Sequence, residues 1–245
     1  MSSWKIVLID KTAQSEVPLD QLRQIADALQ QQVDNDFAPI WGVRADISAP
    51  APGDVIPPDA LPVNVIDSLA GAGGVHLDDQ GNPYAEAVKG PGLSISISHE
   101  VLEMLADPWG NRFVLSPDID PAYPGRRVFY LVEVCDPCEV SSYPIGDVPV
   151  SDFVFPAFYD KNGVAPFDHC GTLTQPLPAL VPHGCYISWI DPADWKWHQQ
   201  AADGTFDTAD VTLDSNPRAD RDKVFGNNDE DRHNIPAILQ KWPAG

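Results

Sequence analysis

The sequence of 245 residues predicts an α+β fold, with a twisted mixed sheet over a long N-terminal helix and a second helix near residue 100. Short apolar runs of strand length alternate with segments whose apolar residues recur at helical spacing. The 25 prolines predict long loops, and strand-like runs after residue 112 predict a β-rich, loop-rich C-terminal part. The expected divisions are an N-terminal subdomain over 1–110, a β-rich subdomain packed on it over 111–200, and an acidic extended arm over 201–245.

Each N-terminal element has its own signal. The run WKIVLID predicts a buried strand at 4–10, and apolar residues at helical spacing predict a helix from Leu19 to Phe37, stopped by Pro39. LSISIS alternates with period two, which predicts a strand over 93–97 that leads into a helix over 99–106. Asp107-Pro108 is expected to end that helix. Further strands are predicted at 40–47, 61–69 and 74–78, the last being an edge strand with a turn at 79–82 and a return strand.

The C-terminal half reads as strands and loops. Strands are predicted in FVLS, RVFYLVEV, YPIGDVPVSDFVFPAFY and CYISWID. From residue 203 to 231 the chain is rich in Asp, Asn and Gly, which predicts an exposed arm or loop.

The charge balance is strongly acidic, with a formal net charge of −21 and an isoelectric point of about 4.3. This argues against nucleic acid and anionic membranes as partners, and it permits the binding of cations. The sequence has no apolar run of membrane-spanning length, and its N-terminus lacks the features of a signal peptide. A cytoplasmic or particle-associated location is expected.

The stretch SHEVLEML carries the candidate chemistry. His99 and Glu103 stand four residues apart, which places both on one helix face. In HExxH enzymes these two positions hold zinc and the intervening glutamate, here Glu100, acts as general base on the bound water. A carboxylate is also a legitimate zinc ligand, so an HExxE metal site is chemically sound.

A third ligand is expected from YLVEVCDPCE. Glu133 is the candidate ligand, because a carboxylate in an apolar strand needs a partner. Asp136 and Asp107 are expected to orient the ligands by hydrogen bonding. Zinc is the preferred ion, although such ligands also accept manganese or iron.

The alternative is that the ordinary residue preferences of a helix N-terminus explain the motif without a metal. Ser98 is a good N-cap, and Glu100 and Glu103 suit the first turn of a helix. Glu133 would then lie on the solvent face of a half-buried strand.

The four cysteines leave three alternatives open: reduced or singly bridged thiols, a Cys170–Cys185 disulfide, or a zinc knuckle that uses the CxxC of Cys135 and Cys138. The sequence contains no GxSxG, GxGxxG or phosphate-loop motif.

The element order, together with a helix carrying His99-Glu100, resembles the N-terminal half of metzincin-type zinc metalloproteases over roughly residues 4–107. Against the family pattern HExxHxxGxxH, Glu103 stands at the second ligand position. Ala106 stands at the glycine and Trp109 at the last ligand. The resemblance implies a zincin-like fold and metallopeptidase activity.

The phrases SHEVLEMLADP, VEVCDP and VSDFVFPAFY are similar to an uncharacterised group of bacterial and bacteriophage-encoded proteins. This similarity implies that the chain is a component of a phage or phage-derived particle.

The sequence therefore predicts a metal-dependent peptidase, with the ion on His99, Glu103 and Glu133 and with Glu100 as the base. Its partner would be a peptide or protein substrate bound along the edge strand 74–78. The rival hypothesis is a catalytically weak or inactive structural or binding protein, such as a virion component, whose partners are assembly surfaces.

Overall fold

Strand β1 (Trp4–Asp10) forms at the predicted apolar run and lies inside a five-stranded sheet, sheet A. The computed structural model describes residues 3–14, 16–69, 72–211 and 217–225. The strand order of sheet A is β2-β1-β3-β5-β4, and every neighbouring pair is parallel except β4 with β5. The other strands are β2 (Ala45–Ser48), β3 (Ala60–Ile66), β4 (Gly74–Asp79) and β5 (Asn82–Val88). The predicted edge hairpin is confirmed, with β4 as the edge strand.

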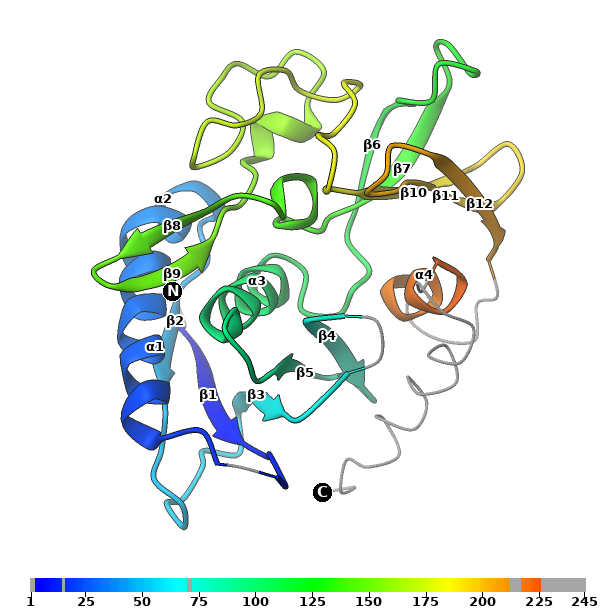
Figure 1. The fold of residues 1–245 in the computed structure, drawn as a ribbon. Coiled ribbons are helices and arrows are strands. Elements are labelled where there is room, and N and C mark those ends of the chain that lie inside the picture. The colour runs from blue at the N-terminus through cyan, green and yellow to red at the C-terminus, as the bar shows by residue number, and fades with distance from the viewer. Residues whose placement is uncertain (1–2, 15, 70–71, 212–216, 226–245) are drawn as a thin grey trace.

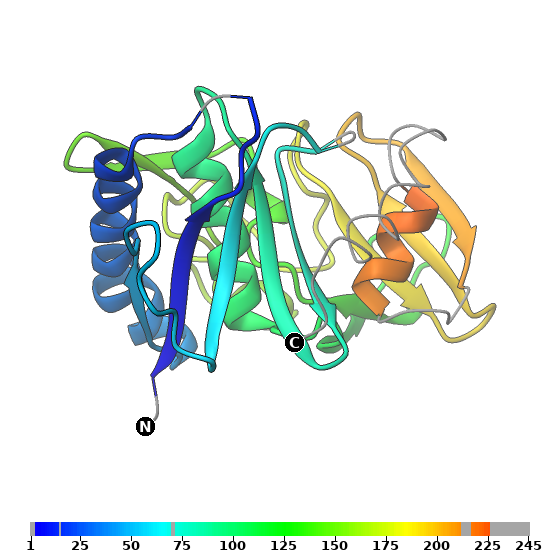
Figure 2. The ribbon, with the colours of Figure 1, turned by 90° about the horizontal axis from the view of Figure 1, so that it is seen from below.

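Helix α1 (Leu19–Gln32) lies on the same face of sheet A as the central helix α3 (Leu93–Ala106), as Figures 1 and 2 show. The predicted stop at Pro39 is wrong. The chain continues through a π-helical turn, η1 (Val33–Phe37), into α2 (Ala38–Trp41) and ends at Gly42 with φ of 72°. Pro39 is tolerated because it stands in the first turn of α2, where its missing N–H needs no partner. The strand predicted over 40–47 is therefore shortened to β2.

The strand predicted over Leu93–Ile97 is also wrong, because these residues form the first turns of α3. Leu93 and Ile97 are buried, whereas the three residues between them are half-buried, so burial follows the helical period of four. Tertiary packing thus overrides the local alternation of LSISIS. Ser98 lies in the middle of the helix and is not its N-cap. Its hydroxyl instead donates to Oε1 of Gln32 at 2.7 Å and ties α3 to α1.

The C-terminal half builds sheet B, which is antiparallel with order β12-β11-β10-β7-β6. Its centre is filled by the buried rings of Trp189 and Tyr130, 5.5 Å apart. A separate hairpin covers part of α1 and α3 (Figure 1). The elements are β6 (Phe113–Pro117), β7 (Arg127–Leu131), η2 (Asp136–Cys138), β8 (Ser142–Ile145), β9 (Val148–Ser151), η3 (Pro156–Tyr159), β10 (Ile187–Asp191), β11 (Lys196–Gln200) and β12 (Phe206–Asp210).

Part of the segment expected to be an exposed arm is ordered structure. Strand β12 extends sheet B past residue 200, and α4 (Pro217–Phe225) lies between β4 and sheet B in Figures 1 and 2. Two of its arginines, Arg218 and Arg221, are each only 3% exposed. The remainder of the predicted arm, 212–216 and 226–245, lies outside the described residues.

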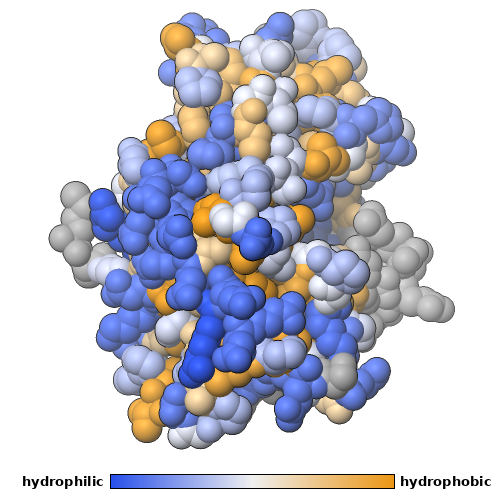
Figure 3. Space-filling model, turned by 60° about the vertical axis from the view of Figure 1, so that its left-hand side comes forward, coloured by the Kyte–Doolittle hydropathy of each residue, from blue (hydrophilic) through white to orange (hydrophobic). Residues whose placement is uncertain are grey.

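The surface of the molecule agrees with the acidic composition. The face turned forward in Figure 3 is mostly hydrophilic, with small separate hydrophobic patches. Within the described residues, no helix is long and apolar enough to cross a membrane. All four cysteines are free thiols, so the alternative of a Cys170–Cys185 disulfide is wrong.

Candidate metal centre

The HExxE motif lies in the buried middle of α3, where one helical turn brings its first and last residues, His99 and Glu103, together. Nε2 of His99 is 3.3 Å from Oε1 of Glu103, one turn further along. His99 is 9% exposed and Glu103 is fully buried. The helical spacing of these two residues, predicted from the sequence, is confirmed by α3.

Asp136, and not Glu133, is the residue that joins this pair. The chain leaves β7 at Leu131 and turns into η2, which begins at Asp136. Oδ1 of Asp136 lies 3.1 Å from Nε2 of His99. One ligand atom from each of His99, Glu103 and Asp136 lies within 4.8 Å of the others. Asp136 was expected only to orient the ligands, and it stands here as a candidate ligand.

Glu133 lies outside the described groups that could hold an ion. It is 4% exposed, so the alternative that placed it on a solvent face is wrong. The alternation argument fails because β7 ends two residues earlier. Its Oε1 instead accepts a hydrogen bond from Nε of Arg218 at 3.0 Å and lies 3.7 Å from Nη2 of Arg221.

A second group forms on the other side of Glu103, around His76 of the edge strand β4. Nδ1 of His76 is 3.4 Å from Oε2 of Glu103 and 3.5 Å from Oε2 of Glu100. One ligand atom from each of these three residues again lies within 4.8 Å of the others. Glu103 therefore belongs to both groups, with Oε1 toward His99 and Oε2 toward His76.

Glu100 is packed directly beneath β4. A Cβ on Gly74 would stand 2.7 Å from Oε1 of Glu100 and 2.8 Å from its Cγ, closer than real atoms approach. Glycine at this position therefore lets the carboxylate lie under the edge strand. His76 and Gly74 signal the site in the sequence only through their place in the predicted edge strand.

Two arginines of α4 enter the carboxylate cluster, and nothing in the sequence pattern predicted them. Nη2 of Arg218 lies 3.5 Å from Oε2 of Glu103 and 3.6 Å from Oε2 of Glu100. Its Nη1 donates a short hydrogen bond to the backbone carbonyl of His76. Nη1 of Arg221 lies 3.4 Å from Oδ2 of Asp136. Arg218 and Arg221 were missed because α4 lies in the segment predicted as an arm.

Burial and neighbouring charge shift the pKa values of the cluster in opposite directions. Burial disfavours the charged form of His99, but the carboxylates of Glu103 and Asp136 outweigh it and raise the pKa of His99 well above its usual range. Burial alone would raise the pKa of Glu103, yet His99 and the other cationic neighbours hold it well below the usual value. Burial raises the pKa of Glu133 and of Asp136. Without an ion, protons and guanidinium groups thus offset the carboxylate charge.

Asp107 does not orient Glu103. Its Oδ2 accepts a hydrogen bond from the backbone N–H of Arg112 at 2.7 Å, so it caps the turn that follows α3. The helix ends at Ala106, as the Asp107-Pro108 pair predicts.

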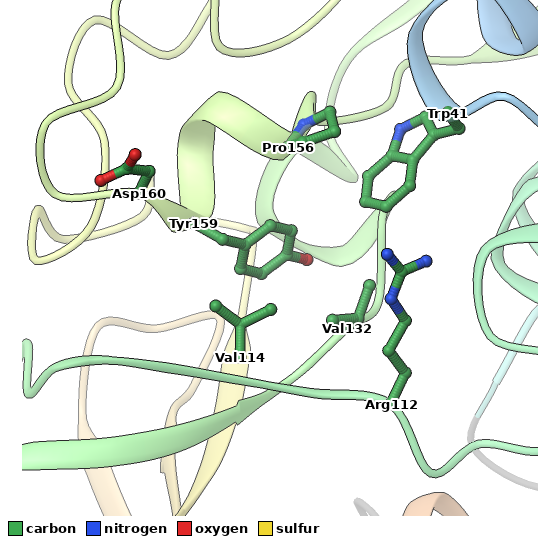
Figure 4. Close-up of a pocket in the computed structure, with 7 residues that line it drawn as sticks. All are labelled: Trp41, Arg112, Val114, Val132, Pro156, Tyr159 and Asp160. Carbon is green, nitrogen blue, oxygen red and sulfur yellow. The ribbon is translucent and has the colours of Figure 1, made fainter.

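Two further features lie apart from the cluster. Asp191, Asp194 and His198 form a third acidic group, but Asp191 is paired with Arg126. A small cavity of about 130 Å³ lies at Val132 beside the ring of Tyr159, whose hydroxyl donates to the carbonyl of Glu133 (Figure 4). The residues that line it, drawn in Figure 4, include none of the metal-ligating candidates.

The atom spacing suits a divalent ion chemically. Bonds of about 2.0–2.1 Å at the tetrahedral angle place two ligand atoms about 3.3–3.4 Å apart. The separations of 3.1 Å and 3.3 Å around Nε2 of His99 are close to that value. The arrangement can hold one ion through one imidazole and two carboxylates, and Glu100 belongs to the adjoining group that shares Glu103. Comparison of the chain with models of known families, with curated proteins and with solved structures finds no match.

Proposed function

We propose that the protein is a metal-dependent hydrolase of zincin-like fold that cleaves peptide bonds, with the ion on His99, Glu103 and Asp136. The observation that supports it best is the convergence of three ligand atoms from α3 and η2 within 4.8 Å. Zinc fits this donor set, and manganese or iron would also be accepted. When bound, the ion would supply Lewis acidity and lower the pKa of a water.

Glu100 and strand β4 would supply the general base and the substrate-binding edge. Glu100 would accept a proton from the attacking water, because its carboxylate lies next to Glu103 under β4. Strand β4 is the edge of sheet A, so an extended peptide would add to it as a further strand once Arg218 leaves the His76 carbonyl. Burial of the cluster keeps bulk water from Glu100 and strengthens its interactions.

Elemental analysis tests the metal. Protein dialysed against zinc and then against buffer is expected to retain one ion per chain, and His99→Ala and Asp136→Ala are expected to lose it. His183→Ala is the control, since His183 is exposed and belongs to none of the three groups. Absence of bound zinc in the wild-type chain would overturn the proposal.

Catalysis needs its own measurement. Zinc-loaded protein is expected to release peptides from an unfolded protein such as casein, and Glu100→Gln is expected to abolish release while keeping the ion. Equal activity of wild type and Glu100→Gln would remove Glu100 from the mechanism.

A structural or binding role, for example in a phage particle, is a second candidate because the arginines of α4 already neutralise part of the cluster. Arg218 pairs with Glu133, Glu100 and Glu103. In that case the network locks α4 in place without an ion. Retained stability and no bound zinc in the chain would favour this candidate.

A further inference from the structure

His76 is a buried histidine whose ring nitrogens have no hydrogen-bond partner among the described residues. It is 1% exposed, and neither Nδ1 nor Nε2 is bonded. Oε2 of Glu100 and Oε2 of Glu103 are likewise buried without a hydrogen bond. A buried polar group without a partner costs free energy, so a cluster of three such groups needs a ligand.

The three atoms lie close to one another. Nδ1 of His76 lies 3.4 Å and 3.5 Å from the two carboxylate oxygens. These separations match the spacing of about 3.3–3.4 Å that tetrahedral coordination requires. An imidazole nitrogen and two carboxylate oxygens are the donors that zinc, cobalt and manganese accept.

A cation already stands beside the two carboxylate oxygens in the described form. Nη2 of Arg218 lies 3.5 Å from Oε2 of Glu103 and 3.6 Å from Oε2 of Glu100. Arg218 donates to the backbone carbonyl of His76 and makes no hydrogen bond to either nitrogen of its ring. Arg218 thus neutralises the carboxylates and leaves the ring nitrogens unbonded.

We propose that His76, Glu100 and Glu103 form a second divalent-cation position, which Arg218 fills in this form and a metal ion fills when Arg218 leaves. This rests on the proposed function only in that Glu103 is shared with the first position. Glu103 would then serve both positions, because its Oε1 lies toward His99 and its Oε2 toward His76. Two-metal sites of this kind hold ions about 3.5–4 Å apart.

Either occupant of the second position lies against the carboxylates of Glu100 and Glu103. Because both bind the same two carboxylates, they exclude each other.

Cobalt titration tests the proposal, since bound Co²⁺ is counted by elemental analysis and its visible absorption reports coordination. Wild type is expected to bind one ion and Arg218→Gln two. The double variant Arg218→Gln/His76→Ala is expected to bind one ion again. A single ion in Arg218→Gln, or two ions that persist without His76, would overturn the second position.

Two controls separate the effect of Arg218 from that of its neighbour Arg221, and the second ion position from the first. Arg221→Gln removes the neighbouring guanidinium of α4, which contacts Glu133 and Asp136 but not His76, and is expected to bind one ion. A second ion in Arg221→Gln would overturn the competition with Arg218. Loss of the first ion is tested independently by His99→Ala in the Arg218→Gln background, which is expected to keep one ion at His76.

Folding of each variant is checked by circular dichroism before titration. Where His76→Ala does not fold, His76→Asn replaces it, because the smaller amide retains a polar group in the buried position. Two cobalt ions in Arg218→Gln/His76→Asn would overturn the assignment in the same way.

Discussion

Oδ1 of Asp136 lies 3.1 Å from Nε2 of His99, although 37 residues separate them in the chain. The contact joins the start of η2 to the middle of α3 and defines the candidate metal centre together with Glu103. It also distinguishes Asp136 from Glu133, which lies three residues earlier and pairs with the arginines of α4.

This difference predicts opposite effects of two conservative substitutions. Asp136→Asn is expected to lower zinc retention, because the amide removes a charged donor from the ion. Glu133→Gln is expected to keep the zinc, since its carboxylate faces Arg218. Zinc per chain after dialysis against a weak chelator measures both. Loss of zinc in Glu133→Gln alone would restore the ligand set predicted from the sequence.

Removal of the guanidinium of Arg218 is expected to destabilise the protein. Arg218→Ala removes a buried cation that three buried carboxylates share, and breaking a buried pair costs about 3–5 kcal/mol. Arg23→Ala is the matched control, because its pair with Asp20 is exposed and is worth at most about 1 kcal/mol. Urea unfolding compares them. Equal midpoints in the two variants would show that the ion pairs of Arg218 contribute no stability.

Gly74 is expected to tolerate no side chain. Gly74→Ala places a Cβ 2.7 Å from Oε1 of Glu100, so the carboxylate or β4 must move at a cost of about 1–3 kcal/mol. Gly90→Ala is the control, because a Cβ there meets nothing within 4 Å. Thermal unfolding and metal binding of the two variants are the measurements. An unchanged melting temperature in Gly74→Ala would contradict the close packing of Glu100 under the edge strand.

Asp152 predicts a pH dependence of stability away from the metal centre. Burial and the neighbouring Asp168 raise the pKa of Asp152 from 3.8 to about 6. As the pH falls from about 6 towards 3.8, the native state takes up a proton that the unfolded state does not. Protonation of Asp152 therefore stabilises the native state, and the free energy of unfolding increases on acidification. This stabilisation is lost as the pH rises through about 6.

Asp152→Asn removes this dependence. The amide oxygen still accepts from the N–H groups of Phe153 and Cys170, so the variant is expected to be more stable near pH 7 by on the order of 2 kcal/mol. The difference in unfolding free energy between wild type and variant, measured from pH 4 to 7, is the test. Asp54→Asn, in an exposed turn, corrects for the loss of one surface carboxylate. A difference that does not vary with pH would contradict the shifted pKa.

Several elements followed from local pattern alone. The apolar run of β1, the helical spacing of α1 and the turn signals of the β4–β5 hairpin are local properties, and each produced its element. The limits of this reasoning appear at residues 93–97. There the serine and isoleucine alternation fits a strand, but the packing of Leu93 and Ile97 against the core favours the helix.

The sequence by itself determined that His99 and Glu103 share a helix face, because four residues make about one turn. It also determined the acidic charge and the edge strand that carries His76. Only the tertiary structure decided that Asp136 joins His99, that His76 faces Glu100 and Glu103, and that Arg218 enters the same cluster. These contacts join residues of separate elements, and their meeting depends on how sheet A, α3, η2 and α4 pack, which no local periodicity encodes.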